Sequence, residues 1–272
     1  MTVPATATRT ADVRLLQIAY GDTERLSERV ERVTAVVRQQ RGADLVVLPE
    51  LWAHGGFSYH SWQEGAEPLT GPTVTALRAA AREAGVVLHG GSIIERDAAS
   101  GALYNTAVVI DREGELVATY RKLHRFGFSA GEPTLLTAGE QLATVDLDLG
   151  GEFVPVGLAT CYDLRFPELF RMLTVNGMQL SVIVAAWPLA RVDHWRVLAQ
   201  ARAVENQVAV IACNTAGTHA GVAMGGHSMV IDPQGRVLAE AGEDEQVLAV
   251  ELDLGGVDST RANFPVLLDR RF

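Results

Sequence analysis

Three side chains of reactive type each come directly after an apolar segment of this sequence. Glu50 follows "ADLVVLP", Lys122 follows "LVATYR", and Cys161 follows "FVPVGLAT". Each segment has the length and composition of a buried strand, and functional side chains in α/β sheets often lie at the ends of strands. The spacing along the chain leaves open whether the three side chains meet.

Glutamate, lysine and cysteine brought together would perform acyl transfer. A cysteine thiolate is the nucleophile, a glutamate can take the thiol proton, and a nearby ammonium lowers the pKa of a thiol from about 8.5. The ammonium can also stabilise the oxyanion formed on the attacked carbonyl, an effect of roughly 3–4 kcal/mol per donor. Because Pro167 is expected to open a helix, the backbone N–H of Tyr162 is a candidate second donor.

Each of these residues also has an ordinary structural interpretation. A lone cysteine after a strand is usually an inert packing residue. Lys122 would then be a solvated strand end, and Glu50 a helix cap or a surface carboxylate. The presence of all three residues at the ends of strands is less easily explained by these structural roles, which favours the catalytic interpretation. Cys213 ends a strand with no polar segment after it, and we interpret it as structural.

The composition and charge exclude several classes of partner. The chain has 272 residues, 48% hydrophobic and 21% charged, as in an ordinary soluble globular protein. The net charge is −10 and no run of lysine and arginine exceeds two residues, so we expect no nucleic-acid partner and no membrane surface. The chain lacks an apolar signal sequence and any apolar segment of about 18 residues, and it has two cysteines, which favours a cytoplasmic protein.

The sequence indicates no metal or cofactor site. The seven histidines form no H-x-H or H-x-x-x-H pair, and the two cysteines lie far apart in sequence. Neither a P-loop nor a dinucleotide-binding glycine pattern is present. The segment "GFSAG" (127–131) matches the G-x-S-x-G pattern of serine hydrolases, but it lacks the strand and helix that should flank it. We therefore expect neither a cofactor nor a serine hydrolase.

Strands and helices alternate along the chain, which predicts mixed sheets with helices packed outside them. Residues 1–11 are expected to form a flexible tail, and no linker divides 12–272, so we expect a single domain. We expect a helix at 22–40 with Asp22 as its N-cap. Further helices are expected at 73–84, 167–176 and 193–205. Strands or hairpins are expected at 13–20, 43–49, 86–94, 103–122, 141–148, 153–160, 180–186, 207–213, 227–240 and 246–253.

Two hairpin segments look alike. "VIDREGELVA" (109–118) is similar to "VIDPQGRVLA" (230–239). Similar hairpins commonly use similar residues, but the similarity also fits two topologically related halves of one sandwich.

The segments around the three reactive side chains resemble the signature segments of the nitrilase superfamily of carbon–nitrogen hydrolases. They are "LPEL" (48–51), "YRKLH" (120–124) and "CYDLRFPEL" (161–169), in the order of the family. The resemblance extends from about Val13 to Leu252. It implies an αββα sandwich of two mixed sheets with outer helices, pairing into an αββα–αββα dimer or a larger homo-oligomer. It implies no cofactor or metal.

The resemblance also implies a role for each reactive residue. Glu50 is expected to be the general base, Lys122 the oxyanion-stabilising lysine and Cys161 the nucleophile. The family has a second glutamate in the loop after the lysine, for which Glu132 is our match and Glu140 a weaker one. Such an enzyme forms a thioester on the cysteine, and a water activated by the base then hydrolyses it.

The residues near the cysteine indicate the branch of the family. "CYDLRFPEL" and "ARAVENQ" (201–207) are typical of Nit-type and omega-amidase-like members, whereas true nitrilases usually have tryptophan at the position of Tyr162. We therefore expect an amidase that releases ammonia from a small ω-amido acid. The alternatives are an N-carbamoyl amine or amino-acid hydrolase, a biosynthetic amidase for a larger substrate, and a catalytically inactive binding module.

An ω-amido acid carries a carboxylate, and the loop "AAWPLARVDHW" (185–195) contains residues that suit it. Arg191 is expected to pair with that carboxylate and Trp187 to form a wall of the pocket, unless Arg191 is only a solvated loop residue. Arg165 and Glu168 are expected to hold the turn of the nucleophile through ion pairs. Two aromatic residues are further candidates for the pocket lining: Phe57 and Phe128.

Overall fold

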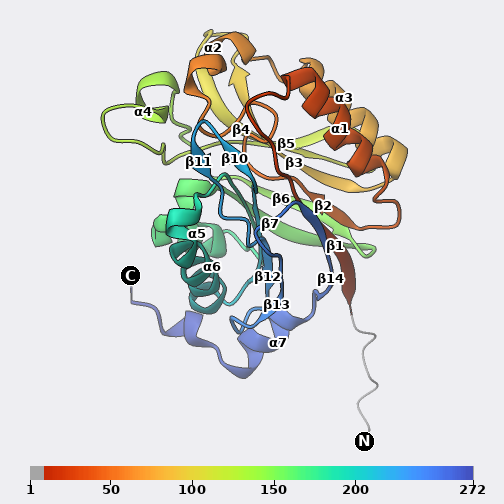
Figure 1. Ribbon diagram of the computed structural model, residues 1–272. Helices are drawn as coiled ribbons and strands as arrows, with labels where there is room; N and C mark the ends of the chain where they lie inside the picture. Colours follow the sequence, from red (N-terminus) through yellow and green to blue (C-terminus); the bar gives the residue numbers. More distant parts are fainter. Residues whose placement is uncertain (1–8, 272) are drawn as a thin grey trace, which may run out of the picture.

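Two mixed sheets of six strands lie face to face in the computed structural model, which describes residues 9–271 (Figure 1). The strand order is β14-β1-β2-β3-β4-β5 in the first sheet and β13-β12-β9-β8-β7-β6 in the second. The first sheet consists of β1 (Thr10–Gln17), β2 (Leu45–Val47), β3 (Val87–Arg96), β4 (Leu103–Ile110), β5 (Leu116–Arg121) and β14 (Gln246–Asp253). The second consists of β6 (Thr144–Leu149), β7 (Glu152–Thr160), β8 (Leu180–Ala185), β9 (Ala209–Asn214), β12 (Met229–Ile231) and β13 (Val237–Glu240). A separate ribbon contains β10 (Thr218–His219) and β11 (Val222–Ala223).

The two sheets follow the same plan. Three parallel strands form the centre of each, β1-β2-β3 in the first sheet and β7-β8-β9 in the second. An antiparallel strand flanks each trio on one side, β14 or β6, and antiparallel strands extend it on the other, β4-β5 or β12-β13. The similar segments at 109–118 and 230–239 form the turns of these equivalent hairpins. The topology therefore supports the interpretation of two related halves.

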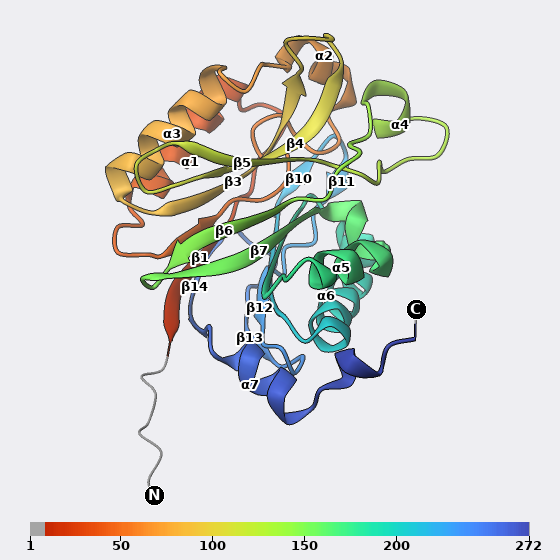
Figure 2. The same ribbon diagram turned by 180° about the vertical axis from the view of Figure 1, so that it is seen from behind.

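Two pairs of helices cover the outer faces of the sheets (Figures 1 and 2). α1 (Leu26–Arg38) and α3 (Pro72–Ala84) pack on the first sheet, and α5 (Pro167–Val175) and α6 (Val192–Asn206) pack on the second. The layers follow the order helix, sheet, sheet, helix, which confirms the predicted αββα sandwich. Within residues 9–271, no helix has both the length and the apolar character needed to cross a membrane. Shorter helices are α2 (Trp62–Gly65), α4 (Glu132–Leu135) and α7 (Gly256–Asn263).

Apolar side chains fill the space between the sheets and the space under each helix pair. In β2, Leu45 and Val47 face the core between the sheets, whereas Val46 faces α1 and α3. Both faces of this central strand are covered, which explains its continuous apolar sequence. Cys213 of β9 lies in the same inter-sheet core, with its Sγ atom 3.4 Å from the carbonyl oxygen of Val47.

The first helix does not begin where the sequence predicts. α1 begins at Leu26 with Arg25 as its N-cap, so the prediction of Asp22 as the N-cap is wrong. The Asp22 carboxylate accepts the backbone N–H of Ala220 at 2.8 Å instead, a tertiary contact that competes with a capping role. The end of α3 agrees with the prediction, because Gly85 follows it with a φ of 70°.

The predicted N-terminal tail, residues 1–11, extends too far toward the C-terminus. β1 begins at Thr10, and Thr10 pairs with Asp253 of β14, so the last residues of the segment 1–11 belong to the sheet. Residues 1–8 lie outside the described part of the chain. The partner strand comes from the far end of the sequence, which local composition does not reveal. One apolar core joins both sheets. The single-domain interpretation of 12–272 stays a prediction.

Candidate active site

The three reactive side chains lie just beyond the ends of β2, β5 and β7. The Nζ atom of Lys122 lies 2.8 Å from Oε1 of Glu50. The other carboxylate oxygen of Glu50 accepts the backbone N–H of Ala186, which follows β8 in the opposite sheet, at 2.8 Å. Glu50 and Lys122 are each 2% exposed and Cys161 is 8% exposed. The structure therefore brings these groups together in a buried site between the two sheets, where both charges act on the thiol.

Cys161 occupies a strained backbone position. Its φ of 50° lies in the left-handed region that residues with a side chain rarely adopt. It begins a 3₁₀ turn, Cys161–Arg165, between β7 and the helix that Pro167 opens. Tyr162 is the second residue of this turn, where a backbone N–H has no partner within the turn itself. The turn thus holds the sulfur at the strand exit and leaves an N–H beside it.

Asp163 connects the turn that carries Cys161 to the strand end that carries Lys122. Its fully buried carboxylate accepts the backbone N–H of Thr160 at 2.9 Å and the hydroxyl of Tyr120 at 2.7 Å. It also accepts the backbone N–H of His124 at 3.0 Å. Tyr120 and His124 lie on either side of Lys122 in sequence, so one carboxylate fixes both segments relative to each other.

The predicted ion pairs of Arg165 and Glu168 do not hold this turn. Neither residue forms an ion pair with any group in residues 9–271, and Glu168 is exposed at the start of α5. The guanidinium of Arg165 stacks instead on the ring of Trp187, 4.6 Å from its centroid. The sequence prediction is wrong because the buried carboxylate of Asp163, inside the turn, holds the turn by accepting hydrogen bonds from Thr160, Tyr120 and His124.

The electrostatics of the thiol differ from the sequence expectation. Burial raises the pKa of Cys161 well above its ordinary value, the Glu50 carboxylate raises it further, and Lys122 opposes both effects. The ammonium therefore acts in the predicted direction but is outweighed. The thiol keeps its proton until a base removes it, and Glu50 is the adjacent carboxylate.

The lysine is shared between two carboxylates. Its Nζ atom lies 2.9 Å from Oε1 of Glu132, the first residue of α4, in addition to its contact with Glu50. Burial alone lowers the pKa of Lys122, but Glu132 and Glu50 raise it well above the ordinary value. Burial raises the pKa of Glu132, and Lys122 lowers it. The weaker candidate, Glu140, is exposed and lines a different cavity.

Asn105 is a site residue that the sequence analysis missed. It lies in β4, is 2% exposed, and its Nδ2 atom donates to Glu50 at 2.8 Å and to Glu132 at 3.0 Å. A polar residue within the apolar strand "LYNTAVVI" was the available signal. Lys122 also carried a signal, because it is the only lysine of the sequence.

A small pocket opens onto the sulfur of Cys161. Three of the four residues predicted to line it do so, and they are Phe57, Trp187 and Arg191. The fourth, Phe128, is 90% exposed and does not line the pocket, so this prediction is wrong. Phe126 lines the pocket in its place, together with Tyr162, Arg165, Ala186 and Pro188. Both phenylalanines lie in a loop, where no periodicity distinguishes an inward from an outward position.

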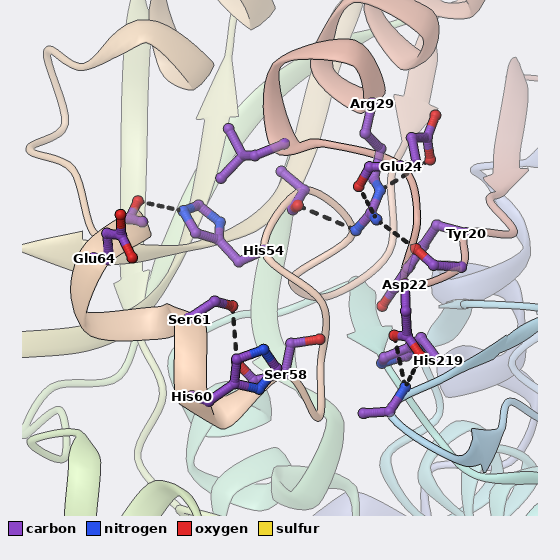
Figure 3. Close-up of a pocket in the computed structure, with 15 residues that line it drawn as sticks. Tyr20, Asp22, Glu24, Arg29, His54, Ser58, His60, Ser61, Glu64 and His219 are labelled. Carbon is purple, nitrogen blue, oxygen red and sulfur yellow. Dashed lines mark hydrogen bonds and ion pairs between the residues drawn. The ribbon is translucent and has the colours of Figure 1, made fainter.

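A second cavity, of about 610 Å³, lies elsewhere, and none of the three reactive side chains lines it (Figure 3). Its buried cation, Arg29, already donates to the carbonyl oxygens of Trp52 and Ala53 at 3.2 Å each. On the side facing the active site, His219 accepts the backbone N–H of Phe57 at 3.3 Å. This region supports the loop that carries Phe57. Its Arg29 is paired with Glu24 at 3.0 Å, and neither a cysteine nor a lysine lines the cavity.

The chain is similar to known proteins over nearly its whole length. It matches the family model described as carbon-nitrogen hydrolase over residues 12–262. It is 45% identical over 262 residues to the 2-oxoglutaramate amidase of Paenarthrobacter nicotinovorans, covering 96% of this chain and 89% of that protein. It is 37% identical to the 2-oxoglutaramate amidase of Bacillus subtilis (strain 168), covering 93% of this chain and 94% of that protein.

A solved structure is also similar over nearly the whole length of the chain. Nit3 of Saccharomyces cerevisiae, a member of branch 10 of the nitrilase superfamily, superposes with a TM-score of 0.86 at 31% identity, covering 97% of each chain. The matched region spans both sheets and the whole buried cluster around Lys122. We conclude that this chain belongs to the carbon–nitrogen hydrolase family of the nitrilase superfamily and is an amidase acting on carbon–nitrogen bonds other than peptide bonds.

Proposed function

We propose that this enzyme hydrolyses the terminal amide of a small ω-amido acid, of the 2-oxoglutaramate type, through a thioester on Cys161. The observation that carries the proposal is the buried contact of the Lys122 ammonium with Glu50 and Glu132 beside the thiol. The names of the two bacterial relatives support the substrate class.

In the proposed first half-reaction, Sγ of Cys161 attacks the amide carbon and Glu50 takes the thiol proton. The Lys122 ammonium and the N–H of Tyr162 stabilise the oxyanion of the tetrahedral intermediate. The carbon–nitrogen bond then breaks, and ammonia leaves with the proton that Glu50 returns. Since the thiol is neutral at rest, the base is needed at the moment of attack.

In the second half-reaction, Glu50 takes a proton from a water, which attacks the acyl-thioester carbonyl. The same two donors stabilise the second oxyanion. The carbon–sulfur bond breaks, the acid product forms, and the thiol recovers its proton. Lys122 stays charged throughout, because Glu132 remains paired with it.

Two arginines are candidates for binding the substrate carboxylate. Arg191 lies over the ring of Phe126, 5.7 Å from its centroid, and Arg165 lies over Trp187. Both line the pocket, and an aromatic ring beneath a guanidinium leaves its donor edge available for a carboxylate. We propose Arg191 as the main partner, with Arg165 as the competing candidate.

The exposed surface supports pairing of two chains. Four large apolar side chains on α5 and α6 are more than half exposed, whereas the exposed large apolar residues of the described chain include none on α1 or α3. We propose that two copies pair through the α5 and α6 face, in the cytoplasm, where Cys161 and Cys213 stay reduced. The four residues are Met172, Val175, Val197 and Val204.

The test is ammonia release from a panel of ω-amido acids, simple amides, N-carbamoyl compounds and nitriles. We expect 2-oxoglutaramate to be preferred and Cys161→Ala to lose activity by at least about 10⁴-fold while remaining folded. Cys213→Ala is the matched control and should keep its activity. An acyl adduct on the intact mass of the enzyme, absent from Cys161→Ala, would support the thioester. Carbon dioxide released together with ammonia would instead indicate a carbamoylase.

A further inference from the structure

Asn105 lies between the two carboxylates of the site. One nitrogen, Nδ2, donates to Oε1 of Glu50 and to Oε1 of Glu132, the same two oxygens that contact Lys122. The backbone N–H of Lys122 donates to the backbone carbonyl of Asn105 at 2.9 Å. The ladder between β4 and β5 therefore sets the asparagine directly beside the lysine.

The orientation of the Asn105 amide follows from charge. Turning it over would direct Oδ1 at two carboxylates, which electrostatics forbids. In the observed orientation Oδ1 is buried and has no hydrogen-bond partner within residues 9–271. An unpaired buried acceptor reduces stability. The amide therefore stabilises the site through the two hydrogen bonds that Nδ2 donates, while its buried Oδ1 atom stays without a partner within residues 9–271.

The site holds two carboxylates and only one ammonium. Burial raises the pKa of Glu132, Lys122 lowers it, and Glu50 raises it again. With the ammonium as the only donor to the facing oxygens, protonation of one carboxylate would relieve the repulsion. A proton held on the pair would leave less of the enzyme with Glu50 free to accept the thiol proton.

We infer that Asn105 is a positioning residue that, as a second donor beside Lys122, keeps Glu50 and Glu132 together without a shared proton, so that Glu50 is available as the base. This inference rests on the proposed function for the role of Glu50, but the geometry can be tested without an amide substrate. It assigns to Asn105 an effect on the pH dependence of the site as well as on its stability.

Other titratable groups face the same carboxylates. They are Lys122, Cys161, Tyr59 and Tyr20. Burial raises the pKa of Tyr59 to about 12 and also raises that of Tyr20, so both phenols stay neutral below pH 9. Lys122 stays charged in that range. A loss of reactivity on the acid side therefore reports the carboxylate pair.

The experiment measures alkylation of Cys161 by iodoacetamide between pH 4 and pH 9, read from intact mass. In this reaction the sulfur bonds to the methylene carbon, iodide leaves, and Glu50 takes the thiol proton. The acid limb of the profile is the pH range in which the alkylation rate falls as the pH falls. We expect Asn105→Leu, whose side chain has a similar volume and no donor, to move this acid limb upward by about one pH unit. The kcat/KM profile for amide hydrolysis should move by the same amount.

The matched control is Thr106→Val, at the next position of β4. Thr106 is fully buried and donates to Glu95, away from the site, so this variant loses a buried hydrogen bond without touching the carboxylate pair. Its acid limb should not move. If Asn105→Leu fails to fold, Asn105→Ser retains a single donor and should show a smaller shift in the same direction.

An alkylation rate that falls equally at every pH in folded Asn105→Leu or Asn105→Ser, with an unmoved acid limb, would overturn the inference. The proposed function fails separately: a wild-type enzyme that releases no ammonia from any amide would refute it, whether or not the alkylation limb moves in the variants. The two results are therefore distinguishable.

Discussion

The hydroxyl of Tyr120 donates to the buried carboxylate of Asp163 at 2.7 Å, and this contact joins the strand that precedes Lys122 to the turn that carries Cys161. Tyr120 belongs to the first sheet and Asp163 follows β7 of the second. The relative position of ammonium and sulfur therefore depends on a hydrogen bond between the sheets.

Replacing Tyr120 by phenylalanine should weaken both the fold and catalysis. The variant loses one donor to a buried charge, so we expect the free energy of unfolding to fall by about 1.5–3 kcal/mol in urea denaturation. kcat should fall more than KM rises, because the relative position of the Lys122 ammonium and the Cys161 sulfur is no longer fixed. Tyr104→Phe is the control, since the Tyr104 hydroxyl has no hydrogen bond within residues 9–271. Equal effects of both substitutions would refute this role.

The only lysine of the chain should remain charged at unusually high pH. Glu132 and Glu50 raise the pKa of Lys122 well above its ordinary value despite burial. A sample labelled with ¹⁵N-lysine gives a single side-chain signal, since no other lysine is present. We expect this signal to keep the shift of an ammonium at pH 10.5, where free lysine is half titrated. Glu132→Gln should lower the titration pH, and a wild-type midpoint near that of free lysine would contradict the ion-pair geometry.

Two buried histidines should make the fold sensitive to mild acid. Burial lowers the pKa of His54 and of His89 to about 4. Between about pH 6.5 and pH 4 the unfolded chain binds protons at these positions and the folded chain does not, so stability falls as the pH falls. Each histidine contributes a slope of about 1.4 kcal/mol per pH unit. Urea denaturation at several pH values should show a smaller slope for His89→Gln, and an unchanged slope for a variant of exposed His60.

Arg191 should determine selectivity for a carboxylate-bearing amide. Arg191→Leu should raise KM for 2-oxoglutaramate at least about tenfold, the usual effect of losing a charge-assisted hydrogen bond. KM for a neutral amide of similar length should not change. Steady-state kinetics of Arg191→Leu and Arg165→Leu with both substrates separate the candidates. Loss of charge selectivity in Arg165→Leu alone would transfer the role to Arg165.

The apolar face of α5 and α6 should carry the dimer. Met172 and Val175 are 55% and 63% exposed, and charged replacements there would place uncompensated charge in the interface. Met172→Glu combined with Val175→Glu should yield monomers in light scattering after size exclusion. Val117→Glu, at an exposed position of β5, is the control and should remain dimeric. A wild-type chain that is monomeric at all concentrations would disprove the pairing.

Much of the architecture followed from local pattern. The resemblance to the nitrilase superfamily implied the αββα sandwich. The alternation of apolar strands and amphipathic helices predicted mixed sheets with helices packed outside them, and the ends of three apolar strands pointed to Glu50, Lys122 and Cys161. These features depend on residues that are adjacent in the chain, so periodicity and composition reveal them. The N-cap of α1 and the start of β1 were missed because Ala220 and Asp253, distant in sequence, determine them.

By itself, then, the sequence determined the order of strands and helices and the types of side chain at the strand ends. Only the tertiary structure decided that Phe126 and not Phe128 faces the pocket, and that Asn105 bridges the two carboxylates. It also decided that the thiol is neutral at rest, because burial outweighs the ammonium. Loop orientation and the balance of desolvation against charge depend on groups that come together only when the two sheets pack.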